Sequence, residues 1–253
     1  MTFITFACLI VALGWIALVN RFAYGISRNL SRKVDRHITR RYARRVFAIV
    51  TTYKNFRFVG DSDLLDELPP QYLVLSNHQS LLDIPVFMLL LGGERLRFIA
   101  KIELGNHVPL ISLILKSDQH CLIERSGSPS AIMKSMDAFA DRVRTNNWIP
   151  VLFPEGTRSL DGSLGKFHAA GFRRFEEKAP MPVAVCAVDG GWRVSSLKGM
   201  SQNLQDGRYH AKVLKIYPVP HSKAEAMHIL EEGRELIQRQ LEEWRNPVNC
   251  PVH

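Results

Sequence analysis

The 253-residue sequence is poor in cysteine, and its four cysteines are scattered along the chain. They are Cys8, Cys121, Cys186 and Cys250, without a Cys-x-x-Cys pair or a Cys/His cluster at the spacing of metal ligands. This pattern argues against a disulfide framework and a structural zinc site, and it favours a reducing compartment.

The sequence also lacks a Gly-x-Ser-x-Gly elbow, internal repeats and any low-complexity linker. In hydrolases the elbow presents a nucleophilic serine between a strand and a helix, so its absence argues against a covalent serine intermediate. The absence of repeats and linkers indicates that the body of the chain is a single domain.

Acidic residues are scarce between residues 20 and 60, where Asp35 is the only one. Eleven lysines and arginines give this stretch a net charge of +10, against +9 for the whole chain. The other residues therefore sum to −1, and no basic stripe runs through the body of the chain. This distribution argues against a nucleic-acid partner.

The seventeen residues before the basic stretch, 3–19 (FITFACLIVALGWIALV), contain Thr5 as their only clearly polar member. As a helix they would be about 25 Å long, which is marginal for a hydrocarbon core of about 30 Å. A cleaved signal peptide would have a charged start and a small-x-small site, and the segment has neither. A helix of a soluble core is the other alternative. We favour a membrane anchor, spanning or deeply embedded.

The basic stretch fits a position on the anionic cytoplasmic leaflet, where each cation near the surface adds about 1 kcal/mol of binding free energy. Apolar side chains recur in it every four residues, as in a helix that lies on a membrane. They are Leu30, Val34, Ile38, Tyr42 and Val46. We therefore expect residues 1–57 to form an anchor with a basic amphipathic segment, and residues 58–250 to form the domain on the cytoplasmic face.

Short apolar runs alternate with helical patterns from residue 58 onward. The predicted strands are 72–75, 97–100, 120–123, 148–153, 183–188 and 211–217, and the predicted helices are 80–92, 106–116, 130–145 and 169–178. A last helix opens with the capping box Ser222-x-x-Glu225 and stops before Pro247. The alternation predicts an α/β fold with a largely parallel sheet flanked by helices.

Polar residues follow three of the predicted strands. Asn77-His78 comes after the first strand, Glu124-Arg125 after the third and the stretch 153–159 after the fourth. Ligands of such sheets gather beyond the carboxyl ends of the strands, so we expect a site there.

The first polar cluster, SNHQSLLDIP (76–85), places His78 five residues before Asp83. On one straight helix these side chains would point about 140° apart and could not meet. If Ser80 caps the helix, His78 lies on the incoming turn and can fold back toward Asp83. A structural interpretation stays open, in which Ser80-x-x-Asp83 is only a capping box.

The cluster FPEGTRS (153–159) combines a carboxylate, a glycine and a guanidinium within four residues. Pro154 and Gly156 favour a tight turn that lets a ligand approach the backbone. We expect Glu155 and Arg158 to project from this turn, and a guanidinium suits a phosphate. The alternative is a surface turn with an ion pair of little energetic value.

With these two clusters in this order and spacing, the sequence resembles the glycerolipid acyltransferases, and in particular the bacterial 1-acyl-glycerol-3-phosphate (lysophosphatidate) acyltransferases. The stretches 98–104 (FIAKIEL) and 121–125 (CLIER) match intermediate blocks of that family, so the resemblance covers roughly residues 70 to 190. It implies a single acyltransferase domain with His78 as general base and Asp83 as its orienting partner. The residues that it implies for glycerol phosphate binding are Arg125, Glu155, Gly156 and Arg158, with Lys101 on the same surface.

The resemblance implies transfer of a fatty acyl group from acyl-CoA or acyl carrier protein to the free hydroxyl of 1-acyl-glycerol-3-phosphate, giving phosphatidic acid. It implies no metal or redox cofactor. The partners would be the lyso-lipid, the acyl donor and an anionic membrane surface, which in a bacterium is the cell inner membrane. Three alternatives stay open: another lysophospholipid or lyso-aminolipid as acceptor, a hydrolase that uses the same base on water, and a lipid-binding protein without catalysis.

The sequence departs from the family pattern in three places. Glu124 stands where Asp is usual, one residue more separates Phe167 from Gly171, and Pro182 is not followed by a second proline. These departures leave the acceptor and the acyl-chain preference open.

Overall fold

The computed structural model describes residues 15, 51, 55–60, 63–93, 95–101, 119–123 and 127–246. Apart from Trp15 and Thr51, the expected anchor and most of the basic stretch lie outside the described residues, and so does the expected helix 106–116. Among the described residues, no helix combines the length and the apolar character needed to cross a membrane.

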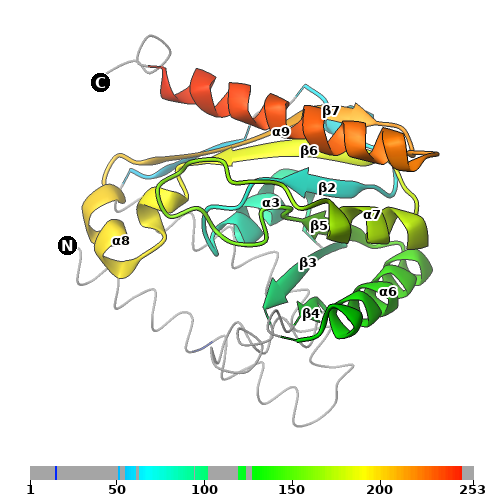
Figure 1. The fold of residues 1–253 in the computed structure, drawn as a ribbon. Coiled ribbons are helices and arrows are strands. Elements are labelled where there is room, and N and C mark those ends of the chain that lie inside the picture. Colours follow the sequence, from blue (N-terminus) through cyan, green and yellow to red (C-terminus); the bar gives the residue numbers. More distant parts are fainter. Residues whose placement is uncertain are drawn as a thin grey trace.

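A central sheet organises the described part of the chain, where seven strands lie side by side (Figure 1). Their spatial order is β1 (Arg57–Gly60), β7 (Arg208–Tyr217), β6 (Val183–Asp189), β2 (Leu73–Ser76), β5 (Ile149–Leu152), β3 (Leu96–Lys101) and β4 (Cys121–Ile123). Neighbouring strands pair in parallel except β6 and β7, which are antiparallel. The prediction of an α/β fold with a largely parallel sheet is confirmed.

The predicted strands differ from the observed ones mainly at one end of the sheet. The last strand begins at Arg208, three residues before the predicted start. β1 was not predicted, because its four residues are mostly exposed and carry no alternating apolar pattern. It extends the sheet by pairing with the first half of β7.

The helices of the described residues follow the predicted pattern with small shifts. They are α3 (Asp83–Leu91), α6 (Pro129–Asn146), α7 (Ala169–Lys178) and α9 (Lys223–Arg245), joined by α8 (Leu197–Asn203) and the 3-10 turns η1 (Leu65–Glu67) and η2 (Trp192–Val194). α3 begins at Asp83 rather than at residue 80, because the residues between them form a turn.

The last helix, α9, begins at the predicted capping box. Ser222 Oγ accepts the backbone N–H of Glu225 at 3.1 Å, and Glu225 Oε2 accepts the N–H of His221 at 2.8 Å. The helix ends at Arg245, before Pro247, as predicted. Its apolar stripe is buried against the sheet, and Figure 1 shows α9 lying along β6 and β7.

The helices cover both faces of the sheet, because successive side chains of a strand point to opposite faces. Leu73 and Leu75 of β2 pack in a core with α6, α7 and α9. Val74, between them, packs in a second core with α3 and η2. The result is three layers, with the sheet in the middle, which explains why the strands read as continuous apolar runs.

One edge of this sheet gathers the ends of four strands. Ser76, at the end of β2, lies opposite Cys186 of β6, and Leu75 lies opposite Leu152 at the end of β5. Because β7 runs the other way, its amino-terminal end lies beside the carboxyl end of β6, with His210 opposite Asp189. The polar residues that follow β2 and β5 therefore meet at one place.

Candidate active site

His78 and Asp83 are in contact at this edge. The Nδ1 atom of His78 lies 2.5 Å from Oδ2 of Asp83. His78 stands in the loop after β2 and Asp83 is the first residue of α3, so the imidazole folds back onto the helix start. The side chain of His78 is 14% exposed and that of Asp83 is fully buried. The pair is thus sheltered, with the imidazole partly open to solvent.

Asp83 also binds the backbone of the turn that precedes α3. Its Oδ2 atom accepts the backbone N–H of Gln79 at 2.8 Å and of Ser80 at 3.2 Å, while Ser80 Oγ accepts the N–H of Leu82. The reach back to Ser80 is what the capping interpretation predicts. The N-cap of α3 is Leu82, without a side-chain cap, so the prediction that Ser80 caps the helix is wrong. The reach back from Asp83 is present, and the same oxygen contacts His78.

The protonation of His78 follows from these partners. Tyr209 donates its hydroxyl to the other oxygen of Asp83, so every group that contacts this carboxylate is a donor. An ionised carboxylate only accepts hydrogen bonds, and we therefore assign the imidazole proton to Nδ1. In the neutral imidazole with this tautomer, Nε2 carries the lone pair that a general base needs.

Phe153 fixes the plane of the imidazole. The rings of His78 and Phe153 are stacked, with centroids 4.1 Å apart and an interplanar angle of 9°. Phe153 in turn contacts the rings of Phe87 on α3 and Phe98 on β3. The first residue of FPEGTRS therefore anchors the ring of His78 to the core.

The turn 153–159 brackets the backbone of His78. Oε1 of Glu155 accepts the N–H of His78 at 2.8 Å, and the N–H of Ser159 donates to its carbonyl oxygen at 2.8 Å. The turn is closed by a bond from the N–H of Gly156 to the carbonyl of Phe153, and Gly156 has φ of +69°. The predicted need for glycine at this turn is confirmed, because side chains other than glycine rarely adopt this φ.

Glu155 does not project from the turn, so that expectation is wrong. Its side chain is buried, and Oε2 accepts the N–H of Gly165 at 2.8 Å while Oε1 holds His78. Burial raises the pKa of Glu155, and the bonds from His78 and Gly165 oppose this rise. The carboxylate faces inward because two backbone donors from two loops converge on it. Its contact with a phosphate stays a prediction.

Arg158 is half-buried in the same turn. Arg158 forms no hydrogen bond or ion pair with the residues that the structure describes. Arg125 lies outside the described residues, and Lys101 ends β3 with a side chain that is not described. The structure therefore brings together His78, Asp83, Glu155, Gly156 and Arg158.

Two side chains beside His78 fasten its loop to β6. Asn77 pairs with the backbone of Val188, donating from Nδ2 at 2.8 Å and accepting at Oδ1 at 2.9 Å. Gln79 donates to Asp189 at 3.0 Å and accepts the N–H of Gly191 at 3.1 Å. These contacts of Asn77 and Gln79 were not predicted, although the run of polar residues around His78 indicates that the loop forms hydrogen bonds.

Asp189 connects this loop to the end of α9. Arg245 donates from Nε and Nη2 to its two oxygens at 2.9 and 2.6 Å, and also donates to the carbonyl of Gly162 at 2.8 Å. Burial alone would raise the pKa of Asp189, but the bonds from Arg245 and Gln79 hold it below its ordinary value. Nothing in the local sequence pointed to Arg245.

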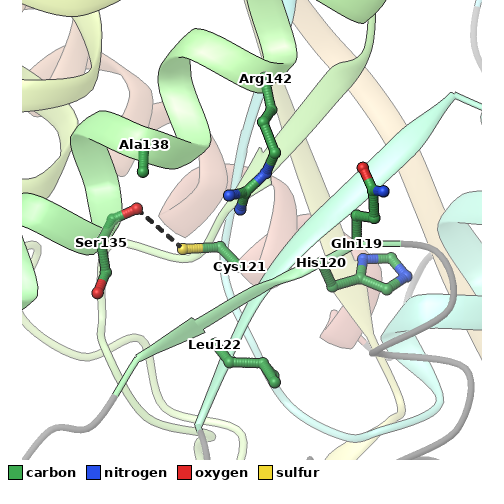
Figure 2. A pocket seen from close by; sticks show the side chains of 7 residues that line it. All are labelled: Gln119, His120, Cys121, Leu122, Ser135, Ala138 and Arg142. Atoms are coloured by element: carbon green, nitrogen blue, oxygen red, sulfur yellow. Dashed lines mark hydrogen bonds between the residues drawn. The ribbon is translucent and has the colours of Figure 1, made fainter.

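A pocket of about 540 Å³ lies elsewhere, beside the edge strand β4 and α6 (Figure 2). Its lining residues are Gln119, His120, Cys121, Leu122, Ser135, Ala138 and Arg142. Burial raises the pKa of the Cys121 thiol to about 12, which disfavours the nucleophilic thiolate. Within the described ranges, no group of three or more His, Cys, Asp or Glu could hold a metal ion.

An α/β sheet with an imidazole–carboxylate pair at its strand ends is compatible with several classes of enzyme, and the sequence comparison identifies the family. The model of the acyltransferase family matches residues 58–189, just over half of the 253 residues. The chain belongs to the acyltransferase family, and the predicted resemblance is confirmed.

Relatives with more specific names match about half of the chain. The 1-acyl-sn-glycerol-3-phosphate acyltransferase of Cocos nucifera is 33% identical over 129 residues, which cover 50% of this chain and 41% of that protein. The protein of the same name from Limnanthes douglasii is 30% identical over 129 residues, covering 50% of this chain and 44% of that protein. The matched part is thus less than half the length of these curated relatives.

One solved structure shares the fold over nearly the whole chain. The crystal structure of the 1-acyl-sn-glycerophosphate (LPA) acyltransferase from Thermotoga maritima matches with a TM-score of 0.68 and 21% identity. The match covers 97% of this chain and 98% of that chain. It supports a single acyltransferase fold with a mostly parallel sheet and flanking helices.

Proposed function

We propose that this chain is an enzyme that transfers a fatty acyl group from acyl-CoA or acyl carrier protein to the free hydroxyl of 1-acyl-glycerol-3-phosphate, giving phosphatidic acid. The observation that carries the proposal is the His78–Asp83 pair, held by the turn 153–159 at the strand ends. Family membership and the names of the curated relatives support the reaction and the acceptor.

In the proposed mechanism, Nε2 of His78 takes the hydroxyl proton as the acceptor oxygen attacks the thioester carbonyl. Asp83 remains ionised and stabilises the imidazolium. When the tetrahedral intermediate collapses, the C–S bond breaks and the leaving thiolate takes the proton from His78. The new ester C–O bond forms directly, without an acyl-enzyme.

The guanidinium of Arg158 supplies the acceptor specificity in this proposal. A planar fork of donors suits a phosphate, and Arg158 has no competing carboxylate among the residues described. Arg125 and Lys101 are proposed to add to the same phosphate site. No metal or redox cofactor is part of the proposed reaction.

Another lyso-lipid acceptor, with a larger head group, is the second candidate. The extra residue between Phe167 and Gly171 leaves this acceptor open, because the segment lies next to the turn: the N–H of His168 donates to the carbonyl of Pro154. A Cβ atom built on Gly156 would lie 3.9 Å from the ring of His168. A change in this segment therefore alters the surface beside Gly156.

The reaction can be tested with the purified full-length chain, a panel of lyso-acceptors, and both acyl-CoA and acyl carrier protein donors. We expect acylated 1-acyl-glycerol-3-phosphate from the wild type and a much slower reaction from His78→Ala. Free fatty acid without acylated lipid would identify a hydrolase instead. Lipid binding without turnover would identify a carrier.

We also propose that residues 3–19 anchor the protein in a membrane, with the domain on the cytoplasmic face. The support is the apolar run followed by the basic stretch. Deleting residues 1–20 should weaken membrane attachment without unfolding the domain. In sealed, right-side-out vesicles the domain should resist added protease, and its digestion from outside would contradict this orientation.

A further inference from the structure

The buried phenol of Tyr209 contacts the side of Asp83 that faces away from His78. Its hydroxyl donates to Oδ1 of Asp83, whereas His78 contacts Oδ2. Tyr209 is fully buried, and burial, the charge of Asp83 and this hydrogen bond raise its pKa well above the ordinary value. The phenol therefore keeps its proton and acts as a donor.

The two oxygens of Asp83 are held in different ways. Oδ2 accepts the backbone N–H groups of Gln79 and Ser80 in addition to the ring of His78. Among the described residues, Tyr209 is the hydrogen-bond donor to Oδ1. It therefore completes the set of donors around a carboxylate that has no exposed surface.

The chain leaves room for this contact at Gly191. A Cβ atom at this position would lie 2.2 Å from the hydroxyl oxygen of Tyr209 and 3.2 Å from Oδ1 of Asp83. Gly191 has φ of −63°, which any residue can adopt, so the requirement for glycine here is one of space. The backbone of Gly191 is held over the contact by its bond to Gln79.

We propose that Tyr209 is a positioning residue for acyl transfer, which fixes the carboxylate of Asp83 so that its other oxygen accepts the Nδ1 proton of His78. The inference rests on the proposed function, because it assigns a part in the reaction to this contact. Tyr209 touches no reacting atom and acts through Asp83 alone.

The contact has a definite electrostatic consequence. A donor to Oδ1 stabilises the negative charge of Asp83 and makes the carboxylate less basic. Without this donor, the carboxylate attracts the proton of the His78 imidazolium more strongly, and one of its oxygens is buried without a partner. The His78–Asp83 pair would then take up a proton at higher pH.

The test is Tyr209→Phe, which removes the hydroxyl and keeps the ring. We expect kcat to fall about tenfold or more, as for a lost hydrogen bond to a charged group, with little change in KM for either substrate. The acid limb of the kcat/KM profile should move to higher pH by about half a unit. The other nearby ionisable groups, Glu155 and the Asp189–Arg245 pair, are unchanged in this variant.

A matched control is Tyr72→Phe. Tyr72 is also buried in the core beside α3, but it precedes β2 and stands at the opposite end of that strand from His78. The Tyr72→Phe variant should leave kcat and the acid limb of the kcat/KM profile unchanged.

A Tyr209→Phe protein with the kcat and the acid limb of wild type would overturn the inference. A loss of rate that is equal at every pH, without a shift of the acid limb, would also overturn it.

Two further measurements keep the test decisive. If Tyr209→Phe does not fold, Gly191→Ala is the second variant. Its methyl group would lie 2.2 Å from the hydroxyl oxygen of Tyr209, so the phenol must move away from Asp83, and the acid limb should move in the same direction. The second measurement needs no acyl transfer. It is the titration of the His78 imidazole in the full-length chain, followed by NMR, with the His78 signal assigned by its absence in His78→Gln. If the wild type transfers no acyl group but Tyr209→Phe raises the His78 pKa, the proposed function fails and the contact stands. An unchanged titration overturns the contact's role.

Discussion

The carboxylate of Glu155 accepts the backbone N–H of His78 at 2.8 Å, although the two residues are separated by 77 positions in the sequence. The same carboxylate holds the N–H of Gly165. One side chain thus joins the loop after β2, the turn after β5 and the segment before α7. A change at Glu155 should reach His78 through the backbone.

Glu155→Gln should lower kcat and destabilise the protein by about 1–3 kcal/mol. An amide offers one acceptor oxygen, so its NH₂ group must face one of two backbone donors. Single-turnover acyl transfer and thermal melts measure the two effects. Glu177→Gln, on the exposed side of α7, is the control and should change neither. Full activity with wild-type stability in Glu155→Gln would contradict the structural role of this carboxylate.

Asp83→Asn separates catalysis from helix capping. An amide can neither fix the imidazole tautomer nor stabilise its cation as a carboxylate does, so we expect kcat to fall by roughly 10²–10⁴, as it should for His78→Ala. If Asp83 served the helix start alone, the variant would lose about 1 kcal/mol of stability and keep its rate per folded molecule. Melts run beside single-turnover assays distinguish the two outcomes.

Arg158→Ala should chiefly raise KM for the lyso-acceptor, by roughly 2–3 kcal/mol of lost charge-assisted hydrogen bonding. Arg158→Lys should restore only part of this, because an ammonium group cannot make a planar fork of donors. Arg144→Ala, at an exposed position of α6, is the control. A change confined to the KM of the acyl donor would place Arg158 outside the acceptor site.

Glu176 should make stability depend on pH. It is buried in α7, and burial raises its pKa to about 8, while the N–H of Met181 opposes the rise. Between pH 4.5 and 8 the folded protein keeps a proton that the unfolded chain has lost. The free energy of unfolding should therefore fall as the pH rises through this window, by up to about 1.4 kcal/mol per unit.

Glu176→Gln should remove this dependence and be more stable than wild type at pH 8. Denaturant unfolding at pH 5 and pH 8 measures both effects, and the difference between variant and wild type isolates Glu176 from other groups. Glu177→Gln, its exposed neighbour, should keep the wild-type slope. Equal slopes in Glu176→Gln and wild type would show that the carboxyl is ionised in the folded protein.

The fold was predictable where the pattern is local. Strands buried on both faces read as apolar runs, and α9 is marked by Ser222 at its start and its apolar stripe. β1 was not predicted, because three of its four residues are exposed and it has no apolar run. The start of β7 was not predicted because polar Arg208 and His210 flank Tyr209, so no apolar run marks it.

Only the contacts between residues that are close in the sequence could be predicted for the site. The meeting of His78 and Asp83 followed from a helix start between them, and the turn at Gly156 followed from its glycine. The inward direction of Glu155 depends on donors in two other loops. Tyr209 reaches the site through the antiparallel pairing of β7 with β6, and Arg245 through the docking of α9. Both depend on tertiary contacts that the local sequence does not predict.

The bond between Arg245 and Asp189 also has a consequence for biosynthesis. His78 leaves the ribosome well before Arg245, which belongs to the last helix of the described residues. A nascent chain that has already formed β2, α3 and β5 still lacks the β7 phenol and the α9 guanidinium. The constellation around His78 is therefore complete only after α9 has left the ribosome and docked on the sheet.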